Sequence, residues 1–218
     1  NRIPLVVFEF KSSIKENATI RNAYTQLTVR YSRDIPELFK YNAFCVISDW
    51  INNKMWSLFA PYDFFYAWRK TDINSKPSDW IDSLFTMIEW LFDKSRLLEV
   101  IKDFVYFPDQ SKSDLKIVCR YPQFYAAKKL FENILVNKKP DWNGKWWTYF
   151  WATWSGKSYT MLYLTRFLMK SKSLSSPTIV IITDRVDLDD QLSTQFWNAK
   201  DFVWDENIIS VESRDDLK

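Results

Sequence analysis

Residues 148–161 of this 218-residue chain read TYFWATWSGKSYTM, and the fold class can be predicted from this stretch. The β-prone, apolar residues 148–153 predict a strand. After Gly156, apolar residues recur at helical spacing, which predicts a helix over residues 159–170. A strand, a tight turn and a helix in this order are typical of α/β proteins with a parallel sheet.

The turn carries the tripeptide Gly156-Lys157-Ser158, which matches the end of a phosphate-binding loop. In such a loop, backbone N–H groups at the helix N-terminus hold phosphates, the lysine neutralises the outer phosphates and the serine hydroxyl binds Mg²⁺. The full motif has a glycine where this chain has Trp151, and the shorter helicase-type loop has a glycine where it has Trp154. The alternative is an ordinary helix start with a serine in its first turn.

A second strand–helix pair follows at residues 178–192, TIVIITDRVDLDDQL. The apolar run 178–183 predicts a buried strand, and the acidic residues after it predict a helix. In one interpretation Asp187 is simply the N-cap of that helix. In the other, the segment belongs to a motor ATPase, and Thr183 and Arg185 face a nucleic-acid backbone.

Near the N-terminus, Phe8-Glu9-Phe10-Lys11 ends an apolar strand predicted over residues 4–10. Glu9 and Lys11 are two residues apart, so on a strand both point to the same face. A carboxylate beside a lysine suits a Mg²⁺-dependent phosphodiesterase, in which the carboxylate holds the metal and the lysine places or activates the water. The alternative is a solvated ion pair without a catalytic role.

Arg120-Tyr121-Pro122-Gln123 comes directly before a helix predicted over residues 122–136. An aromatic ring and a glutamine at this place can hold adenine, with the ring stacking and the amide reading the edge of the base. The alternative is a loop tyrosine packed on the core.

The rest of the chain predicts further elements and two polar linkers. The elements are a helix over residues 18–31, strands over 41–48 and 55–62, and a helical region over 83–104. The linkers are residues 70–79 and 107–116.

Composition narrows the class of protein. A formal charge of +3 gives no case for nucleic acid by itself, and 47% apolar residues exclude a disordered tail. The apolar runs are too short to span a bilayer, so we expect no membrane association. Cys45 and Cys119 lie in apolar stretches and are expected to be unpaired, as in a reducing cytosol. The chain starts without Met or a signal sequence, which indicates a segment from within a protein.

Taken together, these segments resemble the restriction (R) subunit of type I restriction–modification enzymes. The matching stretches, in the order of the family, are PLVVFEFKSS, NAYTQLTVRYSRDIPELFKYNAFCVISDW, SLFAPYDFFYAWRKTD, RYPQFYAAKKL, TYFWATWSGKSYTM and TIVIITDRVDLDDQL. The resemblance implies an α/β chain with a PD-(D/E)xK-type nuclease core and helical extension over residues 1–106. The first half of a RecA-like, parallel-sheet motor lobe of a superfamily 2 translocase would follow over residues 107–218.

The same resemblance implies an activity and partners. The activity is Mg²⁺-dependent cleavage of double-stranded DNA coupled to ATP hydrolysis. The partners are modification (methyltransferase) and specificity subunits, in the cytoplasm of a bacterium or archaeon. In the nuclease, Glu9 and Lys11 match the second carboxylate, which binds metal, and the lysine of the motif. Gln26 and Tyr31 resemble a Gln…Tyr helix that supports the nuclease site.

The resemblance also implies ATP and DNA contacts in the motor lobe. The expected cofactor-binding residues are Tyr121, Gln123, Ser155, Gly156, Lys157 and Ser158. The first two match the adenine-recognising segment, and the others match the phosphate loop, with the Ser158 hydroxyl beside Mg²⁺. The expected nucleic-acid contacts are Thr183 and Arg185, in a motif that also contains Asp184.

The chain departs from the family pattern in three respects. The family has an Asp on a strand upstream of the nuclease Glu, and none of the eight residues before Glu9 is an Asp. The acidic Walker B box of the motor is absent from the chain. The chain has 12 Trp and 2 Gly, where ordinary usage predicts about 15 Gly. Tryptophans at positions where the family has Gly or His are Trp50, Trp56, Trp146, Trp147, Trp151 and Trp154.

Three functional hypotheses follow. The chain is part of a DNA-cleaving, ATP-driven translocase subunit, or a P-loop NTPase without nuclease activity, or a catalytically inert fragment. The third hypothesis rests on the absent Asp and Walker B box and on the Trp residues in the loop. Loss of DNA cleavage on Glu9→Ala distinguishes the first hypothesis from the second.

Overall fold

The computed structural model describes residues 3–12, 19–72, 74–79, 82–109, 115–138, 148–150, 156–204 and 208–211. The chain forms two compact units. The first comprises Asn1–Tyr106 with Ser113–Tyr125, and the second comprises Phe107–Lys112 with Ala126–Lys218. The predicted domain boundary between residues 106 and 107 stays a prediction. The first unit also includes Ser113–Tyr125, which follows that boundary in the sequence.

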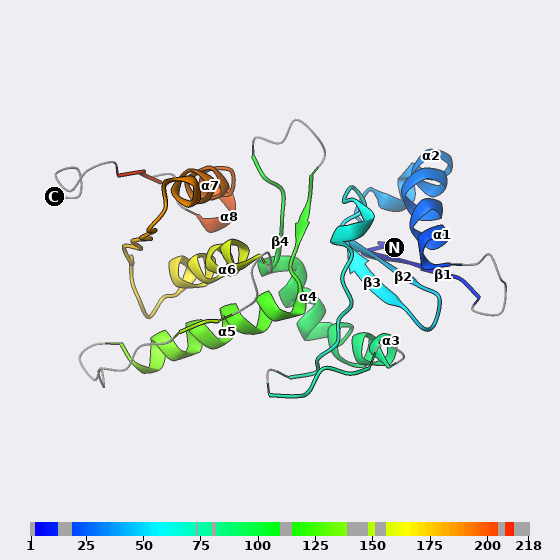
Figure 1. Ribbon diagram of the computed structural model, residues 1–218, viewed down its shortest axis with the longest axis horizontal. Helices are drawn as coiled ribbons and strands as arrows, with labels where there is room; N and C mark the ends of the chain where they lie inside the picture. The colour runs from blue at the N-terminus through cyan, green and yellow to red at the C-terminus, as the bar shows by residue number, and fades with distance from the viewer. Residues whose placement is uncertain are drawn as a thin grey trace. The chain divides into compact units, whose positions relative to one another are not determined.

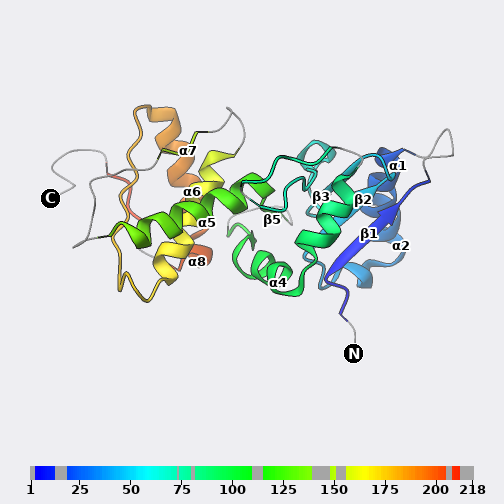
Figure 2. The same ribbon diagram turned by 90° about the horizontal axis from the view of Figure 1, so that it is seen from below.

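A three-stranded sheet forms the centre of the first unit, in the order β1 (Val6–Phe10), β2 (Phe44–Ser48) and β3 (Asn53–Trp56). β1 and β2 are parallel, and β2 and β3 are antiparallel, as Figure 2 shows. All five residues of β2 are buried, which explains its continuous apolar sequence. The strand predicted over residues 55–62 starts two residues earlier and ends at Trp56, because a turn follows in which Ala60 N donates to Ser57 O.

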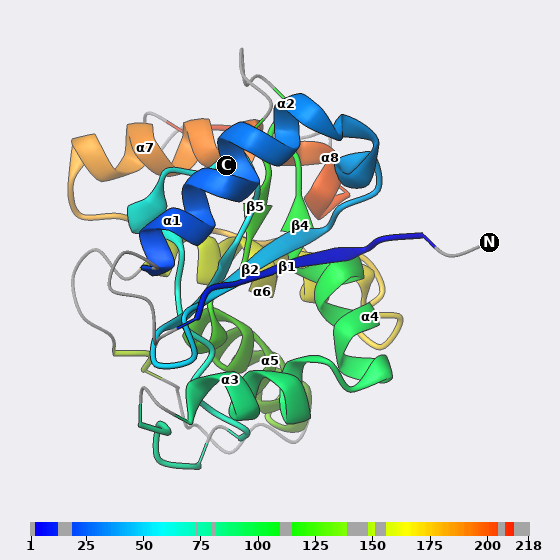
Figure 3. The same cartoon turned by 90° about the vertical axis from the view of Figure 1, so that its right-hand side faces the viewer.

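One face of this sheet is covered by a helical stretch that Figure 3 shows crossing β1 and β2. The stretch comprises α1 (Ile20–Thr25), the π-helix η1 (Gln26–Tyr31) and α2 (Ser32–Asp34). It starts where the Thr19 hydroxyl accepts from Asn22 N. The fully buried side chains of Ala23 and Leu27 show which side is packed. A 3₁₀ turn, η2 (Pro36–Phe39), leads on towards β2.

The other face of the sheet packs against the segment predicted as helical over residues 83–104. Its elements are α3 (Ser83–Thr86), the π-helix η4 (Met87–Leu91) and α4 (Lys94–Asp103). The helix is interrupted before α4, where the Asp93 side chain accepts from Arg96 N and starts a new helix. At the interruption, the Phe92 ring lies 5.0 Å from Phe8 and 6.2 Å from Phe44, centroid to centroid.

Three short elements complete the first unit. They are η3 (Tyr62–Phe64), β4 (Val105–Tyr106) and β5 (Ile117–Val118), the last two pairing antiparallel.

The second unit is helical in its described residues. Its elements are α5 (Tyr121–Val136, of which residues 121–125 belong to the first unit), α6 (Lys157–Lys170), α7 (Val186–Trp197) and α8 (Lys200–Val203), labelled in Figure 1. The buried side chains at its centre include Leu162, Tyr163, Phe196 and Val203. The predicted helices over residues 122–136 and 159–170 therefore form, each with a slightly earlier start.

The strand predicted over residues 178–183 is wrong for this structure. These residues have no regular secondary structure, and the side chains of Val180 and Ile182 are 60% and 88% exposed. A strand forms only when a neighbouring strand accepts and donates its backbone hydrogen bonds, and no strand occurs among the described residues of the second unit. The predicted parallel sheet of a motor lobe is thus not formed there. Residues 148–150 are irregular, and 151–153 lie outside the described residues.

The structure also bears on the cysteines and on membrane-spanning helices. Cys45 and Cys119 are free and buried, as predicted. None of the helices in the described ranges combines the length and apolarity needed to cross a membrane.

Candidate active site

Four side chains predicted for the nuclease form one line of hydrogen bonds at the end of β1. Lys11 Nζ donates to Glu9 Oε1 at 2.6 Å and also to Gln26 Oε1. Gln26 Nε2 in turn donates to the Tyr31 hydroxyl at 2.6 Å. The Glu9 residue is only 8% exposed, so its carboxylate lies at the edge of the packed interior. The structure therefore brings Glu9, Lys11, Gln26 and Tyr31 together.

Local backbone geometry explains why these four meet. Lys11 N donates to Ser48 O at 2.8 Å, which continues the β1–β2 ladder by one residue and keeps the Lys11 side chain on the Glu9 face. Gln26 and Tyr31 begin and end the π-helix η1. In a π-helix each turn closes between residues five apart, so the two side chains lie one above the other.

Among the residues that the structure describes, Glu9 supplies the carboxylate that could bind a divalent metal at this site. Mg²⁺ is ordinarily bound through one or two carboxylates, with water and substrate phosphate completing the shell. Within the described ranges no group of three or more His, Cys, Asp and Glu side chains converges. Glu9 thus fits the lower limit of what Mg²⁺ requires.

The phosphate-loop tripeptide lies at the start of α6 in the second unit. Gly156 has φ 79° and ψ 42°, a left-handed conformation that favours glycine. Lys157 is the exposed first residue of the helix, and Ser158 follows it. The first N–H groups of a helix point outward from its end, where they suit an anion. Ser155, like Trp151 and Trp154, lies outside the described residues.

The residues predicted to recognise adenine are packed inside the first unit. Tyr121 and Gln123 are 6% and 4% exposed. The Tyr121 ring lies 5.7 Å from the ring of Tyr66, and burial raises the pKa of Tyr121 to about 12. Gln123 Oε1 accepts from Arg120 N at 2.8 Å, which caps the start of α5. In this arrangement both side chains have structural contacts, and their role towards adenine stays a prediction.

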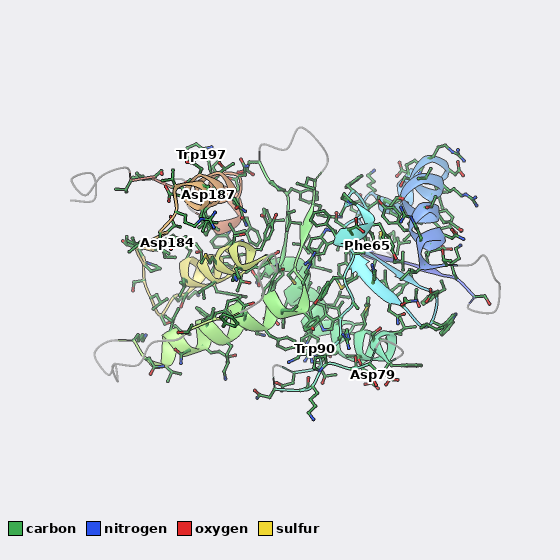
Figure 4. The ribbon with its side chains drawn as sticks, viewed as in Figure 1. Phe65, Asp79, Trp90, Asp184, Asp187 and Trp197 are labelled. Carbon is green, nitrogen blue, oxygen red and sulfur yellow. The ribbon has the colours of Figure 1, made fainter. Side chains whose placement is uncertain are left out.

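The motif after residue 182 surrounds the start of α7 (Figure 4). The helix begins at Val186 with Arg185 at the N-cap, so the alternative that Asp187 is the N-cap is wrong. Arg185 Nε donates to Asp187 Oδ1 at 3.1 Å, and this bond together with the charge raises the pKa of Arg185. Thr183 Oγ1 lies 3.5 Å from Asp189 Oδ1, and Asp184 is exposed. Arg185 is exposed and uses Nε and Nη2 for Asp187, so its contact with a nucleic acid stays a prediction.

Two family models match the chain, each over part of it. Residues 1–64 match the N terminus of the type I restriction enzyme R protein. Residues 122–218 match the SWI2/SNF2 ATPase family. The chain is a relative of type I restriction endonuclease subunits.

Individual relatives agree with this assignment. The HindI endonuclease subunit of Haemophilus influenzae is 34% identical over 100% of this chain. The putative MjaIXP and MjaVIIIP endonuclease subunits of Methanocaldococcus jannaschii are 30% and 31% identical over 90% and 97% of it. The chain spans about a fifth of these relatives, 21%, 20% and 20% of their lengths.

Glycine is predicted at position 50 from the resemblance, and the backbone of Trp50 has the conformation that favours glycine. Trp50 has φ 73°, in a turn where the Asp49 carboxylate accepts from Ile51 N and Asn52 N. Trp204, at the end of α8, also has a left-handed backbone, with φ 64°. The Trp50 ring stacks on Phe10 at 5.6 Å.

Sequence reasoning missed a group of three side chains close to the Glu9 site. Lys54 Nζ lies 4.2 Å from the centroid of the Tyr62 ring, and Arg21 Cζ lies 5.5 Å from it. Arg21 is on α1, Lys54 on β3 and Tyr62 in η3, so only the register of the sheet and the position of the helix bring them together. No motif in the sequence signals this group.

Proposed function

We propose that this chain is the N-terminal part of a type I restriction R subunit that contains the nuclease site and the start of the ATP-driven motor. The nuclease site would comprise Glu9, Lys11, Gln26 and Tyr31 and would cleave double-stranded DNA with Mg²⁺. The hydrogen-bonded line of these four side chains is the observation that carries the proposal. The match of residues 1–64 to the R-protein N terminus supports it.

Each side chain has a part in phosphodiester hydrolysis, in which water attacks phosphorus and the bond to the leaving oxygen breaks. Glu9 would hold Mg²⁺, and the ion would supply Lewis-acid stabilisation of the developing negative charge. Lys11 Nζ, held between Glu9 and Gln26, places a positive charge beside the reacting phosphate. Gln26, bonded to Tyr31, keeps the lysine amine in position.

The first unit would be a PD-(D/E)xK-type nuclease core, and the second unit would begin the ATP-driven motor. Gly156, Lys157 and Ser158 at the start of α6 would hold the phosphates of ATP, and Ser158 would contribute a hydroxyl to Mg²⁺. Thr183 and Arg185 would contact DNA, and Tyr121 with Gln123 would recognise adenine. The SWI2/SNF2 ATPase match over residues 122–218 supports ATP use.

Catalysis by this site would take place in an assembly. The names of the relatives, endonuclease subunits of type I restriction enzymes, support modification and specificity subunits as partners. The coupling of ATP hydrolysis to DNA translocation and cleavage, and a cytoplasmic location, belong to the same proposal.

The test uses the full-length R subunit assembled with its partner subunits. Glu9→Gln and Lys11→Met are expected to lower the rate of DNA cleavage by at least about 100-fold. Lys157→Ala is expected to abolish ATP hydrolysis, because the charge that neutralises the outer phosphates is gone. Lys40→Gln is the matched control: it removes one surface charge from an exposed position and should leave both rates unchanged.

Different results identify the other hypotheses. Unchanged cleavage in both Glu9→Gln and Lys11→Met, with ATP hydrolysis intact in the parent, favours a P-loop NTPase without nuclease activity. The inert-fragment hypothesis concerns the 218-residue chain itself, and ATP binding by this chain in calorimetry would count against it. Thermal unfolding followed by circular dichroism checks that each variant is folded.

A further inference from the structure

The group of Arg21, Lys54 and Tyr62 lies on the same face of the sheet as the candidate nuclease site. In the strand register, Glu9 pairs with Ile47, and Ile47 pairs with Lys54. Paired residues on neighbouring strands point to the same face, so Glu9, Ile47 and Lys54 form one row across the sheet. Two strand spacings place Lys54 about 10 Å from Glu9 along this row. Arg21 belongs to the helical stretch that also supplies Gln26.

The Tyr62 ring holds the two cations. Cation–π contacts keep a positive charge in place without cancelling it, whereas an ion pair would cancel it. In the ranges that the structure describes, neither Arg21 nor Lys54 forms an ion pair within 4.0 Å. The Tyr62 ring also contacts Tyr24, whose ring lies 5.5 Å away in an edge-type contact and whose hydroxyl donates to Ala60 O.

Two carboxylates, those of Asp49 and Asp63, also act on this group, and among the described residues neither forms an ion pair with Arg21 or Lys54. Asp63 follows Tyr62 in the chain, and its charge opposes the lowering of the Lys54 pKa that burial causes. Asp49 also lies near the Tyr62 hydroxyl, but its carboxylate accepts from Ile51 N and Asn52 N within its own turn. Arg21 is exposed and carries a permanent charge.

We infer that Arg21, Lys54 and Tyr62 form a contact for the phosphate backbone of the DNA strand that reaches Glu9 and Lys11. This inference rests on the proposed nuclease function. The two cations, neither held in an ion pair among the described residues, and the continuity of this row with the candidate site favour a DNA backbone as the occupant. At 3.4 Å of axial rise per nucleotide, a distance of about 10 Å corresponds to about three nucleotides from the scissile phosphate. The two cations then set the register of the strand over the site, and they carry no base specificity.

The experiment measures DNA affinity of the full-length R subunit, in its assembly, against salt concentration with a short duplex. Each lost phosphate contact makes the slope of log affinity against log salt less steep by about 0.9. Lys54→Gln and Arg21→Gln are each expected to change the slope by about this amount, and the double variant by about twice as much. Contacts made elsewhere in the subunit add the same slope to every variant.

Two controls accompany these variants. Lys54→Arg keeps the charge and should retain the parental slope, which separates charge from folding. Lys40→Gln removes the same charge from a lysine that is also near a tyrosine ring, 5.9 Å from Tyr41, but that is paired with Glu37 at 3.9 Å. Lys40 precedes β2, and Ala43 N bonds to Leu5 O, so Lys40 lies at the edge where the strands start, opposite Lys11. Its removal should leave the slope unchanged.

Several results would overturn the inference. The first is a salt slope that stays unchanged in the double variant. The second is a change in Lys40→Gln as large as that in Lys54→Gln or Arg21→Gln. The third is a loss of subunit assembly without a change in the salt slope, which would make the occupant an acidic protein surface. Glu9→Gln, measured in parallel, separates the two claims. Cleavage lost in Glu9→Gln with an unchanged slope in the double variant refutes this contact alone. Cleavage retained in Glu9→Gln with a changed slope refutes the nuclease site and leaves a DNA contact.

Discussion

Replacing Trp50 by glycine should give a more stable protein than replacing it by alanine, the reverse of the usual order. The φ of 73° at Trp50 places the residue in the left-handed region. This conformation costs a residue with a Cβ about 1–2 kcal/mol, a cost that glycine does not have. Glycine loses about 0.4–1 kcal/mol more backbone entropy on folding than alanine does. Trp50→Gly should therefore exceed Trp50→Ala in unfolding free energy by about 0.8 kcal/mol.

Comparing two variants at one position removes the other terms. Both lose the stacking of Trp50 on Phe10, so that contribution cancels. Ile51, in the same turn and 51% exposed, is the matched control. Its φ is not positive, so there glycine should be less stable than alanine by about 0.4–1 kcal/mol. Urea unfolding of the four variants measures both differences. If Trp50→Ala equals or exceeds Trp50→Gly, the strain assigned to this turn is wrong.

Three further changes have defined outcomes. Tyr31→Phe removes the acceptor of Gln26 Nε2 and should lower the unfolding free energy by about 1 kcal/mol in urea titrations, while no change would mean that water replaces it fully. Burial raises the pKa of Cys45 to about 12, so the native state keeps a proton that the unfolded chain loses from about pH 9 upward. Stability should fall between about pH 9 and 12, and less steeply in Cys45→Ala; equal slopes would contradict this. Trp154→Gly should increase ATP affinity in calorimetry, because the loop glycine lets backbone N–H groups approach phosphate; unchanged affinity would count against a phosphate loop here.

The N-terminal site shows how far local sequence patterns reach. The alternation of side chains on a strand places Glu9 and Lys11 on one face, and the structure joins them at 2.6 Å. The bond between Lys11 and Gln26 cannot be predicted from periodicity, because Gln26 lies 15 residues further along the chain, on a helix with a π-type turn. The resemblance to a known family supplied that pairing.

Apolar runs were informative only where the described chain provides neighbouring strands. The run that forms β1 lies beside β2, so its backbone groups are paired and the prediction is confirmed. The run at residues 178–183 is also apolar but forms no strand, and Ile182 is 88% exposed. An apolar run indicates a need for burial, and it does not indicate which segment will cover it. The position of Lys54 in the same row as Glu9 cannot be predicted from the sequence for a similar reason, since it depends on strand register.

The π-helix η1, beside the candidate site, can lose one residue and still keep Gln26 and Tyr31 aligned. A π turn holds one residue more than an α turn, so deleting a single residue between Gln26 and Tyr31 converts one into the other. Val29, which is 55% exposed, is the residue whose deletion disturbs packing least. In the shortened form the two side chains stand four apart, a spacing that an α-helix also aligns. A single-codon gap in this helix is therefore compatible with an intact Gln–Tyr pair, and sequences of either length are compatible with the same site.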